Sequence, residues 1–314
     1  MKIDNKAIVV VTPVYEDAHA ARHLLQELAL THGSQIFVLV IDDGSLLHPV
    51  GEKIISEAGL TGTVLRLSRN VGHQKAIAIG LNYLASHLQG NETVVIMDSD
   101  GEDSPVSIKD LLLLLESGDV DIVVAQRKNR VETVRFKIFY FLYKMIFQLL
   151  TGRKISFGNF MALKYCALKR LTAMSELWTH LAATVLCSRL RLAFCPLDRG
   201  QRYVGKSKMN FVSLALHGFK GLMIFAEDVL VRVGVVCSFL AISSVAGALL
   251  AVLLKIFGFA TPGWFSIALG ILMLVFLQTG MLVLITLMLT GIVKSGRENV
   301  PNHKEFIENE LHVR

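Results

Sequence analysis

Short apolar runs alternate with amphipathic stretches through the first 130 residues of the chain. The runs are rich in β-branched residues and have the length of buried strands, whereas the stretches between them have the length of helices. The predicted strands are 7–12, 36–41, 63–67, 93–97 and 120–125, and the predicted helices are 18–31, 48–58, 73–87 and 105–116. Strands that alternate with helices build βαβ units, so we predict an α/β fold with a mostly parallel sheet.

Two long uncharged stretches follow near the end of the chain. Val233–Leu254 contains 22 residues and no charge, and Ile256–Val293 is also uncharged, with a Thr-Pro-Gly turn at 261–263. A bilayer core requires about 20 apolar residues in a helix. Buried core helices seldom run so long without a charge. We therefore predict two transmembrane helices, about 233–254 and 265–292, within a region that extends over 229–293.

Basic residues flank this pair of spans on one side. The connecting turn carries only Lys255, whereas five cations stand outside the spans: Lys220, Arg232, Lys294, Arg297 and Lys304. The positive-inside rule then places both termini in the cytoplasm. The first residues contain no apolar run of signal-peptide length. We predict an integral membrane protein (of the cytoplasmic membrane, if bacterial) with a cytoplasmic domain at 1–228 and a cytoplasmic tail at 294–314.

Composition narrows the class of protein further. Apolar residues make up 53% of the 314 residues and charged residues only 18%, which excludes a disordered chain and an ordinary soluble enzyme. The net charge is +6, but the basic residues concentrate in 127–232, next to the predicted membrane region, so anionic lipid explains them and we predict no nucleic-acid partner. The four cysteines show no CxxC spacing, and we expect neither a disulfide nor a zinc site.

Two further apolar stretches have the composition of interfacial helices. Residues 134–150 are aromatic and apolar with three basic residues, and residues 209–226 lead directly into the first predicted span. Such helices lie in the headgroup layer of a membrane. The alternative is that both pack on the sheet as core helices.

Polar clusters follow the predicted strands where each strand ends. They are Thr12–Glu16, Asp42–Ser45, Arg69–Lys75 and Asp98–Asp103. In a parallel sheet the carboxyl ends of the strands share one edge, where ligands bind. The four clusters therefore predict one shared crevice.

The last of these clusters places four carboxylates within six residues. Asp98, Asp100, Glu102 and Asp103 would repel one another unless a cation relieved the repulsion. Mg²⁺ and Mn²⁺ prefer such oxygen ligands and bridge them to substrate phosphates. The alternative is a solvated acidic turn that caps the following helix. The residues of the cluster alone leave both interpretations open.

A phosphate-loop pattern also occurs, at Gly200–Ser207. A true loop of this kind opens the nucleotide-binding sheet, whereas here the predicted sheet precedes the pattern and the membrane region follows it. We therefore discount ATP hydrolysis. The GxGxxG fingerprint of dinucleotide-binding folds is absent from the sequence.

Taken together, in this order and spacing, five motifs are more specific than any one of them. They are Thr12–Glu16, Ile41–Ser45, Arg69–Gln74, Asp98–Asp103 and the pattern Arg202-x-x-Gly205-x-Ser207-Lys208. With them the chain resembles the membrane-anchored family-2 glycosyltransferases of the dolichol-phosphate-mannose synthase type, which include bacterial polyisoprenyl-phosphate glycosyltransferases. The resemblance covers nearly all of the soluble part and the paired spans. It implies a GT-A fold and inverting, metal-dependent transfer of a single sugar from a UDP- or GDP-sugar to a polyprenyl phosphate.

The resemblance also implies roles for individual residues. The nucleotide-sugar would be held by Thr12, Pro13, Tyr15, Glu16, Asp42, Arg69, Lys75 and Asp98. Mg²⁺ or Mn²⁺ would be bound by Asp98, Asp100 and Glu102, and the acceptor phosphate by Arg127, Arg202, Ser207 and Lys208. The catalytic residues would be Asp98, Asp100 and Arg127. The acceptor phosphate is already anionic at neutral pH, so no general base is required, and the metal stabilises the departing diphosphate.

The sequence departs from the pattern of this family at several positions. Glu102 stands where Gln is usual, and the Gly-Asp-Phe-Arg-like motif reads Gly158-Asn159-Phe160-Met161. An amide and a thioether cannot replace a carboxylate and a guanidinium, so a different membrane acceptor remains an alternative. An inactive scaffold in glycan assembly is a second alternative. The sugar, the base and the oligomeric state, including a homo-oligomer, stay open.

Overall fold

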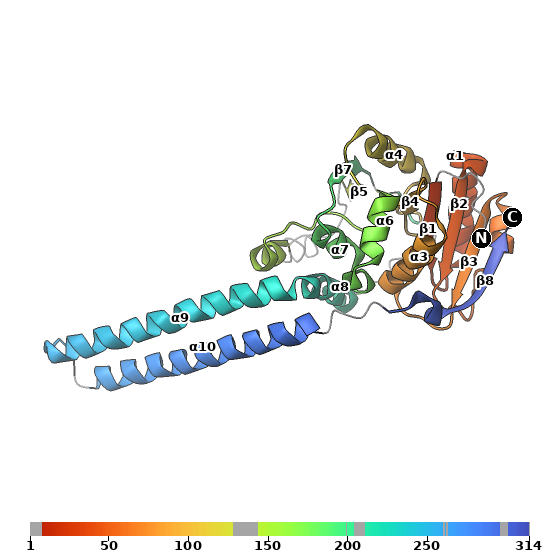
Figure 1. Ribbon diagram of the computed structural model, residues 1–314. Coiled ribbons are helices and arrows are strands. Elements are labelled where there is room, and N and C mark those ends of the chain that lie inside the picture. Colours follow the sequence, from red (N-terminus) through yellow and green to blue (C-terminus); the bar gives the residue numbers. More distant parts are fainter. Residues whose placement is uncertain are drawn as a thin grey trace. The chain divides into compact units, whose positions relative to one another are not determined.

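The computed structural model describes residues 8–127, 144–198, 200–203, 211–259, 261, 263–295 and 301–313. Within these residues eight strands form one sheet in the order β7-β5-β6-β4-β1-β2-β3-β8 (Figure 1). The strands are β1 Ile8–Val14, β2 Ile36–Asp42, β3 Thr61–Leu67, β4 Thr93–Ile96, β5 Ile122–Arg127, β6 Met161–Lys164, β7 Leu192–Leu197 and β8 Ile307–Val313. The chain also divides into two compact units, one built on this sheet and one on two long helices.

The centre of the sheet is parallel, as predicted. β1 pairs in parallel with both β2 and β4, and β2 pairs in parallel with β3. All seven residues of β2 are buried, because helices cover both faces of the sheet. The carboxyl ends of β1, β2 and β4 therefore share one edge, and the polar clusters that follow these strands start there.

The two faces of the sheet are packed by different helices. One apolar core joins alternate strand residues to α3 (His73–His87), α6 (Tyr165–Thr172) and α7 (Leu181–Cys187). The other core joins the intervening strand residues to α1 (Ala18–His32), α2 (Lys53–Glu57) and α4 (Ile108–Ser117). Val9 and Val11 thus face the first core while Val10 faces the second, which is the two-residue period of a strand. α2 is much shorter than the predicted helix 48–58.

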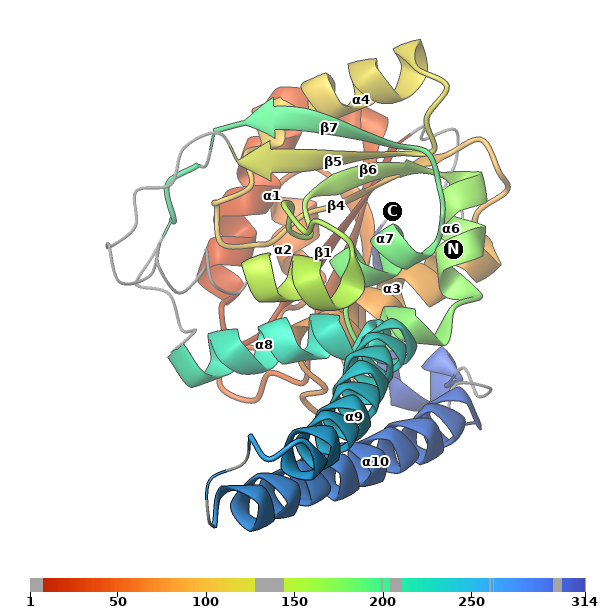
Figure 2. The same ribbon diagram turned by 90° about the vertical axis from the view of Figure 1, so that its left-hand side faces the viewer.

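An antiparallel strand interrupts this pattern. β6 lies between β4 and β5 and runs antiparallel to both, and β7 pairs in parallel with β5 (Figure 2). The strand has only four residues, Met161–Lys164, and its first three are buried. A run this short has no clear periodicity, so the sequence pattern does not predict it.

The residues after the second predicted span also join the sheet. β8 pairs antiparallel with β3, from Gly62 opposite Val313 to Leu67 opposite Ile307. A 3-10 turn, His303–Phe306, precedes it. The segment expected to be a cytoplasmic tail thus contributes an edge strand, and it belongs to the same compact unit as the rest of the sheet.

The second unit consists of two long apolar helices and a short one. α9 (Ala226–Ile256) and α10 (Trp264–Ser295) lie side by side as a hairpin (Figure 1), and both are long and apolar enough to cross a membrane. Most of their large apolar side chains are exposed, unlike those of a soluble core helix. α9 starts seven residues before the predicted span because Glu227 and Asp228 occupy its first turn, where acidic residues are favoured.

A short helix, residues 144–151, belongs to this second unit from Met145 onward. Its Phe147 ring meets the Phe225 ring edge to face at 5.8 Å, and the Arg153 guanidinium lies 5.0 Å from the same ring. Arg232 donates to the carbonyl of Leu149 at 3.1 Å and so satisfies the end of the short helix. The first predicted interfacial helix, 134–150, lies in part outside the described residues. The second corresponds to α8 (Phe211–Ile224) in the first unit.

Candidate active site

Asp42 ends β2 and is completely buried. Its Oδ1 accepts from the backbone N–H of Ser45 at 3.1 Å, and its Oδ2 accepts from that of Val50 at 3.1 Å. Arg66 Nε lies 3.6 Å from Oδ2. Both carboxylate oxygens are therefore engaged by the protein itself, and Asp42 fixes the course of the following loop.

Glu16 holds the same loop from the end of β1. Its carboxylate accepts from the backbone N–H groups of Leu46 at 2.6 Å, Leu47 at 3.1 Å and His48 at 2.8 Å. The hydrogen bond from Leu46, with those from Leu47 and His48, lowers the pKa of Glu16 below its ordinary value. Glu16 has a φ of 49°, a left-handed conformation that few non-glycine residues adopt, and this turn brings the carboxylate to the loop.

Asp43 links β2 to the loop before α3. Its Oδ1 accepts from the N–H of Val71 at 2.7 Å and its Oδ2 from that of Gly72 at 3.0 Å. Burial raises the pKa of Asp43, and these two hydrogen bonds partly offset that increase. The neighbouring Gly44 has a φ of 69°, and a Cβ there would lie 2.4 Å from the carbonyl carbon of Arg69. Only glycine lets the two loops approach so closely.

The acidic loop 98–103 follows β4 and is folded on itself. Asp103 is buried and accepts from the N–H of Asp98 at 2.9 Å, while Asp100 accepts from the N–H of Glu102 at 3.0 Å. Gly101 has a φ of 89°, and a Cβ there would lie 2.9 Å from the carbonyl oxygen of Gln201. The loop is thus packed against residues 200–203, which follow β7.

An arginine from these residues pairs with the acidic loop. Arg202 lies 2.8 Å from Asp100 Oδ2 through one terminal nitrogen and 2.6 Å from Glu102 Oε1 through Nε. Two backbone hydrogen bonds support this pairing, from Gly200 to the carbonyl of Glu102 at 2.9 Å and from Tyr203 to that of Asp100 at 3.0 Å. The guanidinium supplies the positive charge that two close carboxylates require.

Asp98, the first residue of the acidic loop, lies beside a histidine. His73 Nε2, at the start of α3, lies 3.0 Å from Asp98 Oδ1 and 3.3 Å from Asn159 Nδ2. The amide of Asn159 is oriented by Gln74, whose Nε2 donates to Asn159 Oδ1 at 3.0 Å. Gln74 is oriented in turn, because its Oε1 accepts from the backbone N–H of Leu181 at 2.7 Å. Asn159 is therefore part of a polar network that ends at the acidic loop.

The remaining residues predicted from the sequence differ in exposure. Thr12 and Pro13 are buried in β1, and the Thr12 hydroxyl has no hydrogen-bond partner among the described residues. Tyr15 is 47% exposed. Arg69 and Lys75 are exposed and make no ion pair within the described part of the chain. Arg127 lies in β5, but its side chain is outside the described residues, as are Ser207 and Lys208.

The structure brings the predicted clusters to one edge of the sheet but does not gather the acidic side chains into one cage. Across the described residues no group of three or more His, Cys, Asp or Glu side chains is arranged to hold a metal ion. The acidic loop instead presents Asp98 to His73, and Asp100 with Glu102 to Arg202. Sequence reasoning missed His73 and Asn159 as contacts of this loop. The only signal was their position in two of the motifs.

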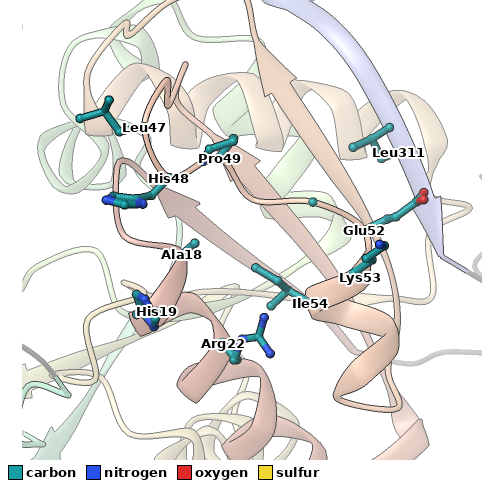
Figure 3. Close-up of a pocket in the computed structure, with 11 residues that line it drawn as sticks. Ala18, His19, Arg22, Leu47, His48, Pro49, Glu52, Lys53, Ile54 and Leu311 are labelled. Atoms are coloured by element: carbon teal, nitrogen blue, oxygen red, sulfur yellow. The ribbon is translucent and has the colours of Figure 1, made fainter.

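A separate pocket of about 580 Å³ opens between the start of α1 and the residues at 47–54 (Figure 3). Its wall carries the basic side chains His19, Arg22, His48 and Lys53, and Leu311 of β8 completes it. None of the residues predicted from the sequence lines this pocket in the described part of the chain. The pocket shares with the candidate site the backbone of Leu47 and His48, which Glu16 holds.

Solved structures with this fold include glucosyl-3-phosphoglycerate synthase from Mycobacterium tuberculosis in complex with Mn²⁺, UDP-glucose and phosphoglyceric acid. It matches with a TM-score of 0.52 at 16% sequence identity, over 69% of this chain and 78% of that one. A complex of the same enzyme with Mn²⁺, UDP and glucosyl-3-phosphoglycerate matches with a TM-score of 0.53 at 14% identity, over 71% of this chain and 80% of that one. These similarities confirm the predicted GT-A fold.

Two bacterial glycosyltransferases are similar to this chain in sequence. An uncharacterized glycosyltransferase of Bacillus subtilis, YkoT, is 26% identical over 290 residues, which is 86% of this chain and 83% of the relative. A dodecaprenyl-phosphate galacturonate synthase of Rhizobium johnstonii is 23% identical over 133 residues, 41% of this chain and 38% of the relative. The glycosyl transferase family 2 model matches residues 9–178, more than half of the chain. With the GT-A sheet and the polar loops at its carboxyl edge, this match shows that the chain is a glycosyltransferase and belongs to glycosyl transferase family 2.

Proposed function

We propose that this glycosyltransferase transfers a single sugar from a UDP- or GDP-sugar to a polyprenyl phosphate at a membrane surface. The observation that carries the proposal is the combination, in one chain, of the acidic loop 98–103 at the carboxyl edge of the sheet and two exposed apolar helices. The loop has the chemistry for a charged donor, and the helices have the chemistry for a lipid acceptor. The similarity to a dodecaprenyl-phosphate sugar synthase supports the same acceptor class.

In this proposal the donor lies between the loops that follow β1, β2, β3 and β4. Glu16, Asp42 and Asp43 shape the donor site, because their carboxylates hold the backbone N–H groups of its loops. Tyr15 is the exposed ring at the end of β1, with the chemistry to stack on a base. Arg69 and Lys75 are the exposed cations available to a diphosphate. Catalysis then depends on how the leaving diphosphate is stabilised.

The residues of the acidic loop fit a divalent cation in their chemistry. Magnesium and manganese are commonly bound by one or two carboxylates together with substrate phosphates, so a complete protein cage is not required. Arg202 already marks the place where Asp100 and Glu102 accept a positive charge. Asp98 and Asp100, with Glu102, would hold the ion. Bound there, Mg²⁺ or Mn²⁺ would supply Lewis-acid stabilisation of charge on the leaving diphosphate.

The protein's own contribution to the transfer is orientation. The network from Leu181 through Gln74 and Asn159 fixes His73 beside Asp98, so the position of the Asp98 carboxylate is set before a donor binds. Such preorganisation lowers the barrier, because the charged groups do not reorganise during the reaction. The acceptor phosphate is itself the nucleophile and needs no base at neutral pH. We propose Arg127, Arg202, Ser207 and Lys208 as its contacts.

The topology of the chain supports a membrane hairpin with both flanks on one side. β8 follows α10 in the sequence, yet it pairs with β3, which precedes α9. If α9 and α10 cross a bilayer, the residues before and after them are therefore on the same side. By the positive-inside rule, the cations that flank the helices support the cytoplasm as that side.

The experiment is an assay of the full-length protein in detergent with a panel of UDP- and GDP-sugars, a polyprenyl phosphate and Mn²⁺ or Mg²⁺. We expect a sugar-phosphate-linked lipid, detected by mass spectrometry, that is lost on chelation and in Asp98→Asn. Absence of a lipid product with every donor, in the presence of either cation, would contradict the proposal.

A second candidate keeps the donor and changes the acceptor. Met161 is completely buried in β6, and Asn159 is engaged with Gln74 and His73. These two positions, which carry the acceptor-side polar groups in the resembling family, offer no charge to a phosphate here. A membrane lipid extract offered as acceptor separates the candidates, because a labelled product other than the polyprenyl-phosphate sugar supports the second.

A further inference from the structure

The loop that carries Arg69 is held at its start by the C-terminal segment, residues 301–313. The backbone N–H of Ser68 donates to the carbonyl oxygen of Phe306 at 3.0 Å, and the Ser68 hydroxyl lies 3.3 Å from the same oxygen. The register of β3 with β8 shifts between Arg66 and Leu67, and the irregular pairing continues to Ser68. The strand pairing thus extends beyond the end of β3 onto the first residue of the loop.

The same segment contacts the elements that surround the other end of this loop. The Tyr83 hydroxyl, on α3, donates to Glu310 Oε2 at 2.9 Å, and Tyr83 is almost completely buried. The Phe306 ring lies 5.7 Å from the ring of Trp178, which is 6% exposed and packs in the core beside α3. The segment therefore joins β3, which precedes the loop, to α3, which follows it.

Between these supports the loop has one further attachment. Asp43 accepts from the N–H groups of Val71 and Gly72, so the end of the loop is fixed from β2. Ser68 is fixed from the C-terminal segment, and Arg69 stands between the two supports with an exposed side chain. A short loop with both ends fixed loses little conformational freedom when a ligand binds.

We infer that the C-terminal segment is a clamp that positions the 68–72 loop for the diphosphate of the donor. The inference rests on the proposed function, in which Arg69 contacts that diphosphate. Phe306 and Ser68 are positioning residues, because they act through the backbone of the loop and not on the substrate. Because the C-terminal segment follows α10 in the sequence, the clamp also connects the 68–72 loop to the end of that helix.

The test compares Phe306→Ala in the full-length protein with the matched control Glu308→Ala, which changes an exposed side chain in the same C-terminal segment. Ser68→Ala is a milder second variant, which removes only the hydroxyl contact. The first readout is amide hydrogen exchange of residues 68–72 without nucleotide. The second is the affinity for UDP and GDP by calorimetry, and the third is kcat and KM for the donor.

In Phe306→Ala we expect exchange at 68–72 to become about tenfold faster while exchange in β1 and β2 is unchanged. Nucleotide affinity and donor KM should worsen about fivefold, with kcat at saturating donor changed less than about twofold, as for a group that positions the binding loop. Ser68→Ala should show the same pattern at about half the size, and it keeps the test decisive if Phe306→Ala does not fold.

Exchange at 68–72 equal to that of Glu308→Ala would overturn the clamp, as would a loss confined to kcat. Failure of the wild-type protein to bind any nucleoside diphosphate would instead contradict the proposed function. The exchange of the nucleotide-free protein decides on the clamp separately, so the two failures are distinguishable.

Discussion

The loop after β2 and the loop after β4 both carry acidic residues at the same edge of the sheet, but the main partners of their carboxylates differ. In the first loop the carboxylates of Asp42 and Asp43, assisted by Glu16, accept from backbone N–H groups. In the second loop Asp98 and Asp100 face the side chains of His73 and Arg202, and Asp100 also accepts from the backbone N–H of Glu102. Backbone partners are fixed by the course of the chain, whereas a side-chain partner can rotate away.

This difference separates the carboxylates that build the site from those that act in it. To exchange its partner for an ion, a carboxylate that holds backbone N–H groups would have to release the loop that it supports. One that faces a flexible guanidinium needs only a side-chain rotation. Two acidic motifs that look alike in the sequence therefore have different expected responses to the same substitution.

The largest effect is expected at the second loop. Asp98→Asn should lower the rate of sugar transfer by about a thousandfold with little change in stability, because it removes charge that stabilises the transition state. The measurement is kcat/KM with the donor and cation of the assay above, with chelated wild-type protein as a parallel. The control is Asp119→Asn, because Asp119 is exposed, pairs with Arg191 and lies away from both loops. A variant that retains a tenth of the activity would contradict the assignment of Asp98.

A substitution in the first loop should lower the free energy of unfolding. Asp42→Asn replaces one acceptor oxygen by a donor that faces a backbone N–H in a buried position, so we expect a loss of about 2–3 kcal/mol in the free energy of unfolding. Urea unfolding of the detergent-solubilised protein measures it. Asp100→Asn, at the second loop, should change the same quantity by less than about 1 kcal/mol. Equal losses for the two variants would remove the distinction between the loops.

Arg202 allows a direct test of exchangeability. Arg202→Gln removes the cation beside Asp100 and Glu102, so the affinity for Mn²⁺ without nucleotide should rise about fivefold. Titration followed by calorimetry or electron paramagnetic resonance measures this affinity. Arg202→Lys keeps a positive charge, so its affinity for Mn²⁺ should lie between that of the wild-type protein and that of Arg202→Gln. Unchanged affinity in both variants would show that the guanidinium and the ion do not compete.

The smallest effect concerns a carboxylate outside both loops. Hydrogen bonds from Arg191 lower the pKa of Asp121 from 3.8 to about 2. A lowered pKa stabilises the fold above the ordinary value, and that contribution is lost as the pH falls from about 4 through about 2. Asp121→Asn should therefore cost at most about 1 kcal/mol at pH 7 and almost nothing once the pH is well below about 2. Thermal unfolding at pH 7 and at low pH tests it. A loss that does not depend on pH would contradict the role of the charge.

The sequence predicts the centre of the fold well, because the strands around β1 are buried on both faces and read as uninterrupted apolar runs. It does not predict β6 or β8. β6 has four residues, and β8 reads Ile-Glu-Asn-Glu-Leu-His-Val, a polar edge strand whose partner β3 is more than 230 residues away. Such pairing is decided by tertiary contacts, which local pattern does not contain.

The sequence predicts where the candidate site lies, but it does not predict which groups in the site contact one another. Parallel-sheet geometry alone brings the clusters at 12–16, 42–45, 69–75 and 98–103 to one edge. The roles of Glu16 and Asp42 depend on which backbone N–H groups their turns approach, and Glu16 reaches them through an uncommon φ. The pairing of Arg202 with Glu102 joins residues 100 positions apart. Spacing along the chain carries no information on either point.

The strand β8 has a consequence for biosynthesis. It leaves the ribosome after α9 and α10, yet its partner β3 is made long before them. The outer edge of the sheet therefore stays open during translation of the apolar hairpin and closes only afterwards. Until then β3 exposes unpaired peptide groups, which are a template for aggregation. Chains that stall before residues 307–313 are made would be exposed to proteases, and closure of the sheet would report that α9 and α10 have already been synthesised.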